Sequence, residues 1–202
     1  MAENPRPGED LALRPVVGRV AVLNLGYFGV EFAVALAIGS VALFADSIDF
    51  LEDAAVNLLI LLGLGWGAAA RARLGMLLAL LLLVPALATL WTAWEKFGAP
   101  LPPAPLPLTL IGVGALLVNG CCAVMLARVR RQGGSLTRAA FLSARNDALA
   151  NLAIIGAGLV IAFLWRSAWP DLLVGLAIAA LNADAAREVW EAARAEHQAA
   201  KA

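Results

Sequence analysis

The sequence predicts an all-α protein, a bundle of six transmembrane helices with both termini in the cytoplasm. Three observations predict this fold. First, the chain of 202 residues is 62% hydrophobic and only 15% charged, which is too apolar for a soluble domain. Second, its apolar residues fall into about six runs, each close to the roughly 20 residues that a membrane-spanning helix needs. Third, its lysines and arginines are unevenly distributed among the segments that join these runs.

Short polar or Gly/Pro-rich breaks separate the predicted spans. In chain order the spans are Val16 to Ile38, Val41 to Trp66, Leu74 to Lys96, Leu106 to Leu126, Ala139 to Trp165 and Leu172 to Trp190. The chain is thereby divided into a cytoplasmic N-terminal segment (1–15), a six-helix transmembrane domain (16–190) and a short cytoplasmic tail (191–202). The N-terminal segment contains acids and prolines and lacks the layout of a cleavable signal peptide, so we expect the first span to be retained.

The positive-inside rule predicts the orientation. With both termini in the cytoplasm, only Lys96 and Arg166 lie in external loops. Twelve cations then lie inside, namely Arg6, Arg14, Arg19, Arg71, Arg73, Arg128, Arg130, Arg131, Arg138, Arg187, Arg194 and Lys201. The remaining cation, Arg145, falls within the fifth span. This imbalance also requires an even number of spans.

The overall composition narrows the possible partners. The 15 Lys and Arg residues balance the 15 Asp and Glu residues, so net charge gives no support for a nucleic-acid partner. Cys121 and Cys122 are adjacent and point about 100° apart on a helix, so they cannot build a disulfide framework. We interpret them as small apolar fillers of the fourth span. No nucleophile and base are paired as an enzyme would need, and we expect no catalytic activity.

The second span contains acids where a bilayer should exclude them. Asp46, Asp49, Glu52 and Asp53 lie within eight residues of an otherwise apolar run. Each carboxylate costs roughly 2.5–3.5 kcal/mol at the centre of a spanning helix, so each one suggests a function. Asp49 and Asp53 are one helical turn apart, with Asp46 one turn earlier and Asn57 one turn later. The sequence therefore predicts a polar stripe along this helix.

The fifth and first spans contain similar stripes. Ser143, Asp147 and Asn151 follow one another at intervals of four residues, with Asn146 beside them. Two facing helices with such stripes would form a cage of oxygen ligands. The first span adds Asn24 and Glu31, seven residues apart on one face. For the asparagines the alternative of hydrogen bonding between helices stays open. For the three aspartates we favour metal ligation, because an amide would join helices without a buried charge.

Crowded carboxylates suit the exchange of a metal for protons. In a low-dielectric site they repel one another, so the empty site should hold protons that an entering divalent cation displaces. An inward proton gradient could then drive metal outward. Oxygen ligands suit harder ions such as Mn²⁺ or Fe²⁺, and the only histidine, His197, lies outside every span.

At these residues the sequence resembles the cation diffusion facilitator family, also called the cation efflux family, from Asn24 to Glu196. One part of the resemblance is residues 40–47, SVALFADS, leading into Asp49-x-x-x-Asp53. A second part is Ser143-x-x-x-Asp147, where the family usually has histidine in the first place. A weaker third part is residues 169–171, WPD, followed by Gly175.

The resemblance implies a six-helix, usually dimeric, proton-coupled exporter of Zn²⁺, Mn²⁺, Fe²⁺, Co²⁺ or Cd²⁺ in the inner (plasma) membrane, with no prosthetic group. It implies Asp49, Asp53 and Asp147 as metal ligands between the second and fifth helices. Ser143 takes the fourth ligand place. Glu31, Asp46, Asn57, Asn146 and Asn151 remain as supporting polar residues. The family commonly has a C-terminal cytoplasmic domain, and we expect a short member that lacks it.

Two other functions remain as alternatives. One is a membrane binding or assembly partner of the same fold that does not transport. The other is a proton-coupled exporter of an organic cation, which would favour an aromatic-lined cavity built from residues such as Tyr27, Phe28 and Phe44. We also expect Gly175 and Ala179 on the sixth span to allow close packing against a neighbour.

Overall fold

The computed structural model describes residues 9–63, 87, 89–98, 101–129 and 134–199. All regular structure in these ranges is helical. The helices are α1 (Glu9–Ile38), α2 (Val41–Gly63), α4 (Pro105–Val129), α5 (Gly134–Phe163) and α6 (Trp169–Ala199). A further helical segment, residues 89–98, lies between α2 and α4 in the chain. The prediction of an all-α bundle is confirmed.

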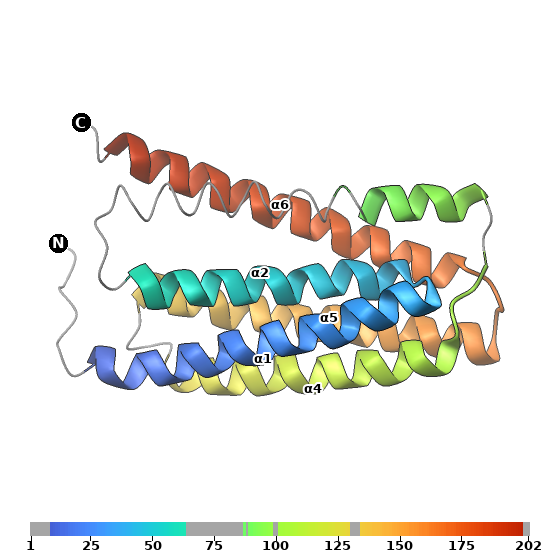
Figure 1. The fold of residues 1–202 in the computed structure, drawn as a ribbon, viewed down its shortest axis with the longest axis horizontal. Coiled ribbons are helices and arrows are strands. Elements are labelled where there is room, and N and C mark those ends of the chain that lie inside the picture. The colour runs from blue at the N-terminus through green and yellow to red at the C-terminus, as the bar shows by residue number, and fades with distance from the viewer. Residues whose placement is uncertain (1–8, 64–86, 88, 99–100, 130–133, 200–202) are drawn as a thin grey trace.

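The long helices run side by side along the long axis of the molecule (Figure 1). α1 packs along α2 and α4 along α5, while α2 also contacts α5 and α6. The first turn of α1 and the last turn of α6 lie at the same end of the bundle. An even number of crossings requires this arrangement, so it agrees with the topology expected from the distribution of cations.

Several helices are longer than the spans that the sequence predicts. α1 begins at Glu9 rather than Val16, and α6 continues to Ala199 rather than ending at Trp190. A helix of 30 residues such as α1 is about 45 Å long, whereas the hydrocarbon core is about 30 Å thick. Polar turns therefore extend beyond the apolar span. In α6 an exposed ion pair, Arg187 Nε to Glu191 Oε1 at 2.8 Å, supports this extension. Most of the predicted third span, 74–96, lies outside the described residues.

A two-residue link joins α1 to α2. Gly39 has a φ of 64°, a conformation that glycine adopts without steric cost. The Ser40 N–H then donates to the Ala35 carbonyl oxygen at 3.0 Å, which ends α1 with a Schellman motif. The Ser40 hydroxyl in turn accepts from the Leu43 N–H at 3.1 Å and caps the start of α2. The link holds α1 and α2 as an antiparallel pair.

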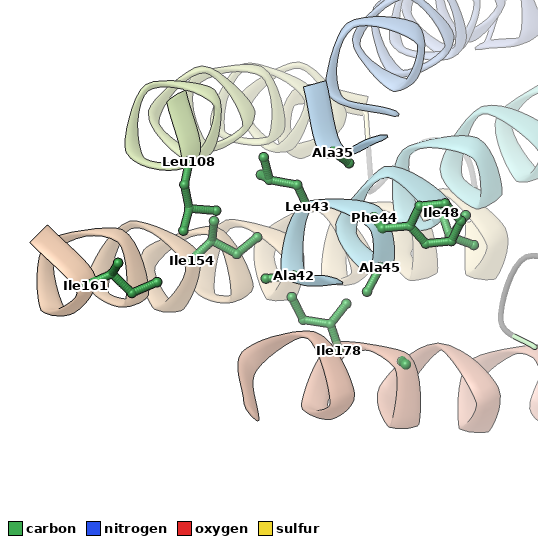
Figure 2. Packing of buried hydrophobic residues seen from close by; sticks show 11 residues of the cluster. Ala35, Ala42, Leu43, Phe44, Ala45, Ile48, Leu108, Ile154, Ile161 and Ile178 are labelled. Carbon is green, nitrogen blue, oxygen red and sulfur yellow. The ribbon is translucent and has the colours of Figure 1, made fainter. Parts of the chain in front are cut away.

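The first half of α2 is the centre of the core. All eight residues from Val41 to Ile48 are buried. Leu43 packs toward Leu108 of α4 and Ile154 of α5, while Ile178 of α6 joins the same cluster from the other side (Figure 2). α2 is therefore enclosed by protein rather than lipid along this half.

The outer surface is apolar and the interior is partly polar. Val22, Leu117 and Leu181 are 66–71% exposed, whereas Asn24 and Glu31 are fully buried. Such a surface is stable in lipid but not in water. Within the described residues, Arg14–Ile38, Pro105–Arg128 and Asn146–Phe163 are long and apolar enough to cross a membrane, and Trp169–Leu181 is a shorter apolar stretch. The chain is a multi-pass membrane protein.

Candidate metal site

The acids of α2 face the interior of the bundle. Asp46 is fully buried, Asp53 is 7% exposed and Asn57 is 1% exposed. Asp49 is half-buried on the same stripe. The burial follows from the helical spacing, because residues three and four apart share the face that α2 turns toward α1 and α5.

Asp53 is held by a relay from two other helices. The Asn24 Nδ2 on α1 donates to Asp53 Oδ2 at 3.3 Å, and the Cys122 Sγ on α4 donates to Asn24 Oδ1 at 3.4 Å. Because the Cys122 thiol donates to the Asn24 amide oxygen, the Asn24 side chain is oriented so that its nitrogen donates to the Asp53 carboxylate. Asn57 does not join this relay, since its Nδ2 donates to the Asp53 backbone oxygen at 2.7 Å. Asp53 is thus oriented by Asn24.

Asp46 is held by a second relay. The Asn151 Nδ2 on α5 donates to Asp46 Oδ2 at 2.6 Å, and the Asn119 Nδ2 on α4 donates to Asn151 Oδ1 at 3.2 Å. Asn151 is fully buried, so the polar stripe of α5 faces α2 at this level. The two relays connect α1, α2, α4 and α5 through the middle of the bundle.

Asp49 of α2 and Asp147 of α5 interact electrostatically across the interface between the two helices. Asp49 interacts electrostatically with Asp147 and with Asp46, Glu52 and Asp53 on its own helix. Asp147 is half-buried, whereas the neighbouring Asn146 is exposed. The side chains of Ser143 and Arg145 lie outside the described part of α5. Among the described side chains, no three His, Cys, Asp or Glu residues lie close enough together to hold one metal ion.

Four buried oxygens in this region have no hydrogen-bond partner in the described protein. They are Glu31 Oε1, Glu31 Oε2, Asp46 Oδ1 and Asn57 Oδ1. A buried acceptor without a hydrogen-bond partner lowers the folding stability by about 1–3 kcal/mol, and by more if it is charged. Three of the four belong to Glu31 and Asp46, and unpaired buried acceptors of this kind are explained by a bound cation or proton.

Two further residues support the site and were not among those predicted from the sequence. Asn119 belongs to the second relay, and the same rule that singled out polar residues in other spans would have found it in the fourth. Cys122 was interpreted as an apolar filler; it is fully buried but also hydrogen-bonds to Asn24. No sequence signal distinguishes it from Cys121, which is exposed.

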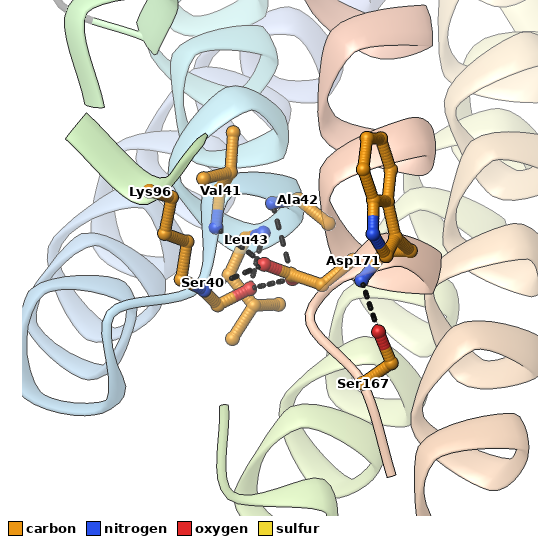
Figure 3. A network of polar contacts seen from close by, with 8 residues as sticks. Ser40, Val41, Ala42, Leu43, Lys96, Ser167 and Asp171 are labelled. Carbon is orange, nitrogen blue, oxygen red and sulfur yellow. Dashed lines mark hydrogen bonds and ion pairs between the residues drawn. The ribbon is translucent and has the colours of Figure 1, made fainter. Parts of the chain in front are cut away.

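A different network holds the start of α2 against α6. The Asp171 carboxylate accepts from the Ser40 hydroxyl at 2.5 Å, from the Val41 N–H at 2.9 Å and from the Ala42 N–H at 3.3 Å (Figure 3). Lys96 Nζ lies 3.1 Å from Asp171 Oδ2 and completes an ion pair. The carboxylate thus satisfies donors that every helix N-terminus leaves free, at the positive end of the helix dipole.

Gly175 explains how α6 can approach so closely. A Cβ atom at this position would lie 2.7 Å from the Val41 backbone carbon, so no larger residue fits without a shift. Ala179 packs one turn further along, in the core cluster with Ala42 and Ile178. The neighbour that these small residues pack against is therefore α2 of the same chain. The WPD sequence and Gly175 serve this contact.

The arrangement agrees with a comparison against known protein families. The model of the cation efflux transmembrane domain matches residues 19–195, which include α2, α4, α5 and nearly all of α6. No curated protein matches the chain significantly. Since the family model matches well over half of the sequence, the chain belongs to the cation efflux family of membrane cation transporters.

Proposed function

We propose that the chain exports a divalent metal cation in exchange for protons, with Asp49, Asp53 and Asp147 as ligands and Ser143 in the fourth place. The observation that carries the proposal is the acid stripe of α2, which lies inside the bundle and in which Asp49 interacts electrostatically with Asp147 of α5. Membership of a family of cation transporters supports the same function.

The described contacts assign a separate role to each residue of the proposed site. A divalent cation between α2 and α5 would offset the repulsion between Asp49 and Asp147 and draw their carboxylates together. Asn24 would keep Asp53 oriented toward the cation, as outer hydrogen bonds do in other metal sites. With oxygen ligands, Mn²⁺ and Fe²⁺ are the first candidates, ahead of Zn²⁺, Co²⁺ and Cd²⁺. We further propose the inner (plasma) membrane as the location and a homodimer as the assembly.

The exporter of an organic cation has less support. Tyr27 stacks on Phe50 with ring centroids 5.0 Å apart and donates its hydroxyl to the Ile111 carbonyl oxygen at 2.6 Å. Phe44 packs on Phe32, which also contacts Phe28. These aromatic side chains are engaged in contacts between and along helices, which leaves them less suited to surround an ammonium group.

The test is metal flux into liposomes that contain the purified protein. Mn²⁺, Fe²⁺, Co²⁺, Zn²⁺ and Cd²⁺ are offered in turn under an imposed pH gradient. We expect gradient-dependent flux of at least one ion, and its loss in Asp49→Ala and Asp147→Ala. The matched control is Leu149→Ala, which alters an exposed apolar residue of α5 near Asp147 and should transport normally.

Each outcome decides between the candidate functions. Flux that persists in both aspartate variants would place the metal elsewhere and refute the proposed ligands. Absence of flux for every ion, in protein shown to be folded, would favour the non-transporting membrane partner.

A further inference from the structure

Two acids beside the candidate metal ligands form a pair of their own. Glu31 on α1 and Asp46 on α2 are both fully buried. Their carboxyl groups face each other closely enough for a hydrogen bond between the side chains. Two carboxylates cannot make that bond, because neither has a hydrogen to donate. Accordingly, both Glu31 oxygens and Asp46 Oδ1 lack a donor.

The surroundings supply no other way to neutralise the pair. Among the residues that the structure describes, the one donor to reach it is Asn151, which bonds Asp46 Oδ2. The other titratable groups that face the pair are Tyr27 on α1 and Asp49 on α2. Tyr27 donates its hydroxyl to a backbone oxygen of α4, and Asp49 adds negative charge. Since neither acid has a cationic partner in the described protein, two adjacent buried charges would be strongly unfavourable.

We infer that Glu31 and Asp46 form a proton-binding site, separate from the metal ligands, in which a proton is shared between the two carboxyl groups. The shared proton supplies the missing hydrogen bond and removes one charge. Asp46 lies one turn before Asp49 on α2, and both acids of the pair interact electrostatically with Asp49. A metal bound at Asp49 therefore favours release of the proton to water, and loss of the metal favours its return.

This inference rests on the proposed function for its role in transport. In transport, the Glu31–Asp46 pair would carry a proton that is exchanged for the metal. The binding of the proton does not depend on transport and can be measured in protein that moves no metal.

Two conservative variants preserve the geometry while removing the titrating group. In Glu31→Gln the new amide can donate to Asp46 Oδ1, which has no partner in the native chain. In Asp46→Asn the amide oxygen can still accept from Asn151 while its nitrogen donates to Glu31. Both variants should therefore fold. The control is Glu95→Gln, which alters an exposed acid of the segment 89–98, outside the pair and outside the proposed ligands.

The experiment is infrared spectroscopy of the metal-free protein at neutral pH, in H₂O and in D₂O. The metal ligands can also hold protons in the metal-free protein, so the readout is the intensity of the carbonyl stretch of protonated carboxyl groups, which shifts in D₂O. We expect this intensity to fall in Glu31→Gln and in Asp46→Asn and to keep its native value in Glu95→Gln. Absence of this band in the native protein, or native intensity of the band in both pair variants, would overturn the inference.

A second measurement tests the role in exchange. The protons released on metal binding are counted with a pH indicator in weakly buffered solution, using Mn²⁺ as the probe. The pair variants should still bind the metal but release about one proton fewer per metal bound than the native protein. Unchanged proton release in both variants would show that the pair does not take part in exchange. If the pair variants lose infrared intensity but the native protein shows no flux for any metal, the proton site stands and the proposed function fails.

Discussion

Two buried carboxylate networks in this bundle differ in how well their oxygens are satisfied. At one end, Asp171 accepts three hydrogen bonds from the start of α2 and pairs with Lys96. In the middle, Glu31 and Asp46 leave three oxygens without a hydrogen-bond partner among the described residues. Asp171, Glu31 and Asp46 are all fully buried, so burial alone does not separate the two networks.

The comparison shows that a buried acid becomes a functional candidate only when the protein leaves its charge unmatched. Asp171 meets an ammonium group and the free amides of a helix N-terminus, which makes it a strong structural contact. The acids in the middle of α2 meet mainly each other and a few amides. This difference predicts that changes at the end of α2 affect stability, whereas changes in the middle affect ion binding.

The largest effect is expected for Asp171→Ala. This variant strands the buried Lys96 and removes the acceptor for two amides of α2, so we expect a loss of about 3–5 kcal/mol in unfolding free energy. The measurement is SDS-induced unfolding of the purified, metal-free protein in mixed micelles. Lys96→Met is the partner control, because it leaves the amide contacts intact and should cost less. A loss no greater than that of Lys96→Met would contradict the structural role assigned to the carboxylate.

An intermediate effect is expected for Asn24→Ala, now on ion binding rather than stability. Without the Asn24 amide, Asp53 loses the donor that orients it, and metal affinity should fall by about 10- to 100-fold. Titration calorimetry with the metal that the flux assay identifies gives the affinity. Asn24→Asp is the control for side-chain volume, because it keeps the size of the side chain but replaces the donor to Asp53 with a second carboxylate. A similar loss of affinity in both variants would assign the effect to the lost donor rather than to the lost volume. Native affinity in Asn24→Ala would show that this relay does not serve the site.

The smallest effect is expected for Ser40→Ala. The variant removes the hydroxyl that caps Leu43, but Asp171 still accepts from the Val41 and Ala42 amides, so the loss should be about 1 kcal/mol. The same SDS titration measures it. Combining Ser40→Ala with Asp171→Ala tests the network directly, because contacting residues should give a combined loss that differs from the sum. Strict additivity would indicate that the hydroxyl and the carboxylate act independently.

Much of the site could be predicted from the intramembrane polar residues. Helical spacing placed Asp46, Asp53 and Asn57 on one buried stripe, and Asn151 on the face of α5 that meets α2. Asn119 could have been found by the same rule. The role of Cys122 could not, because a thiol is common as an apolar filler and its bond to Asn24 depends on how α1 and α4 pack.

The positions of helix ends were harder to predict. Apolar length marks only the part of a helix that lipid covers, so the polar turns of α1 and α6 were missed. The spacing of residues in the sequence also did not predict the close contact between α6 and α2. Gly175 signals that something approaches closely, but only the packed structure shows that the partner is Val41 of the same chain.

The sequence by itself determined that the chain is a membrane protein of several helices and that its interior acids form stripes. Both follow from local properties, since transfer of apolar runs into lipid and the 3.6-residue helical period depend only on the order of residues. The tertiary structure alone decided which acids are satisfied and which are not. Asp171 and Asp46 both stand in apolar surroundings along the chain, but a carboxylate is matched only by donors that the fold brings from other helices.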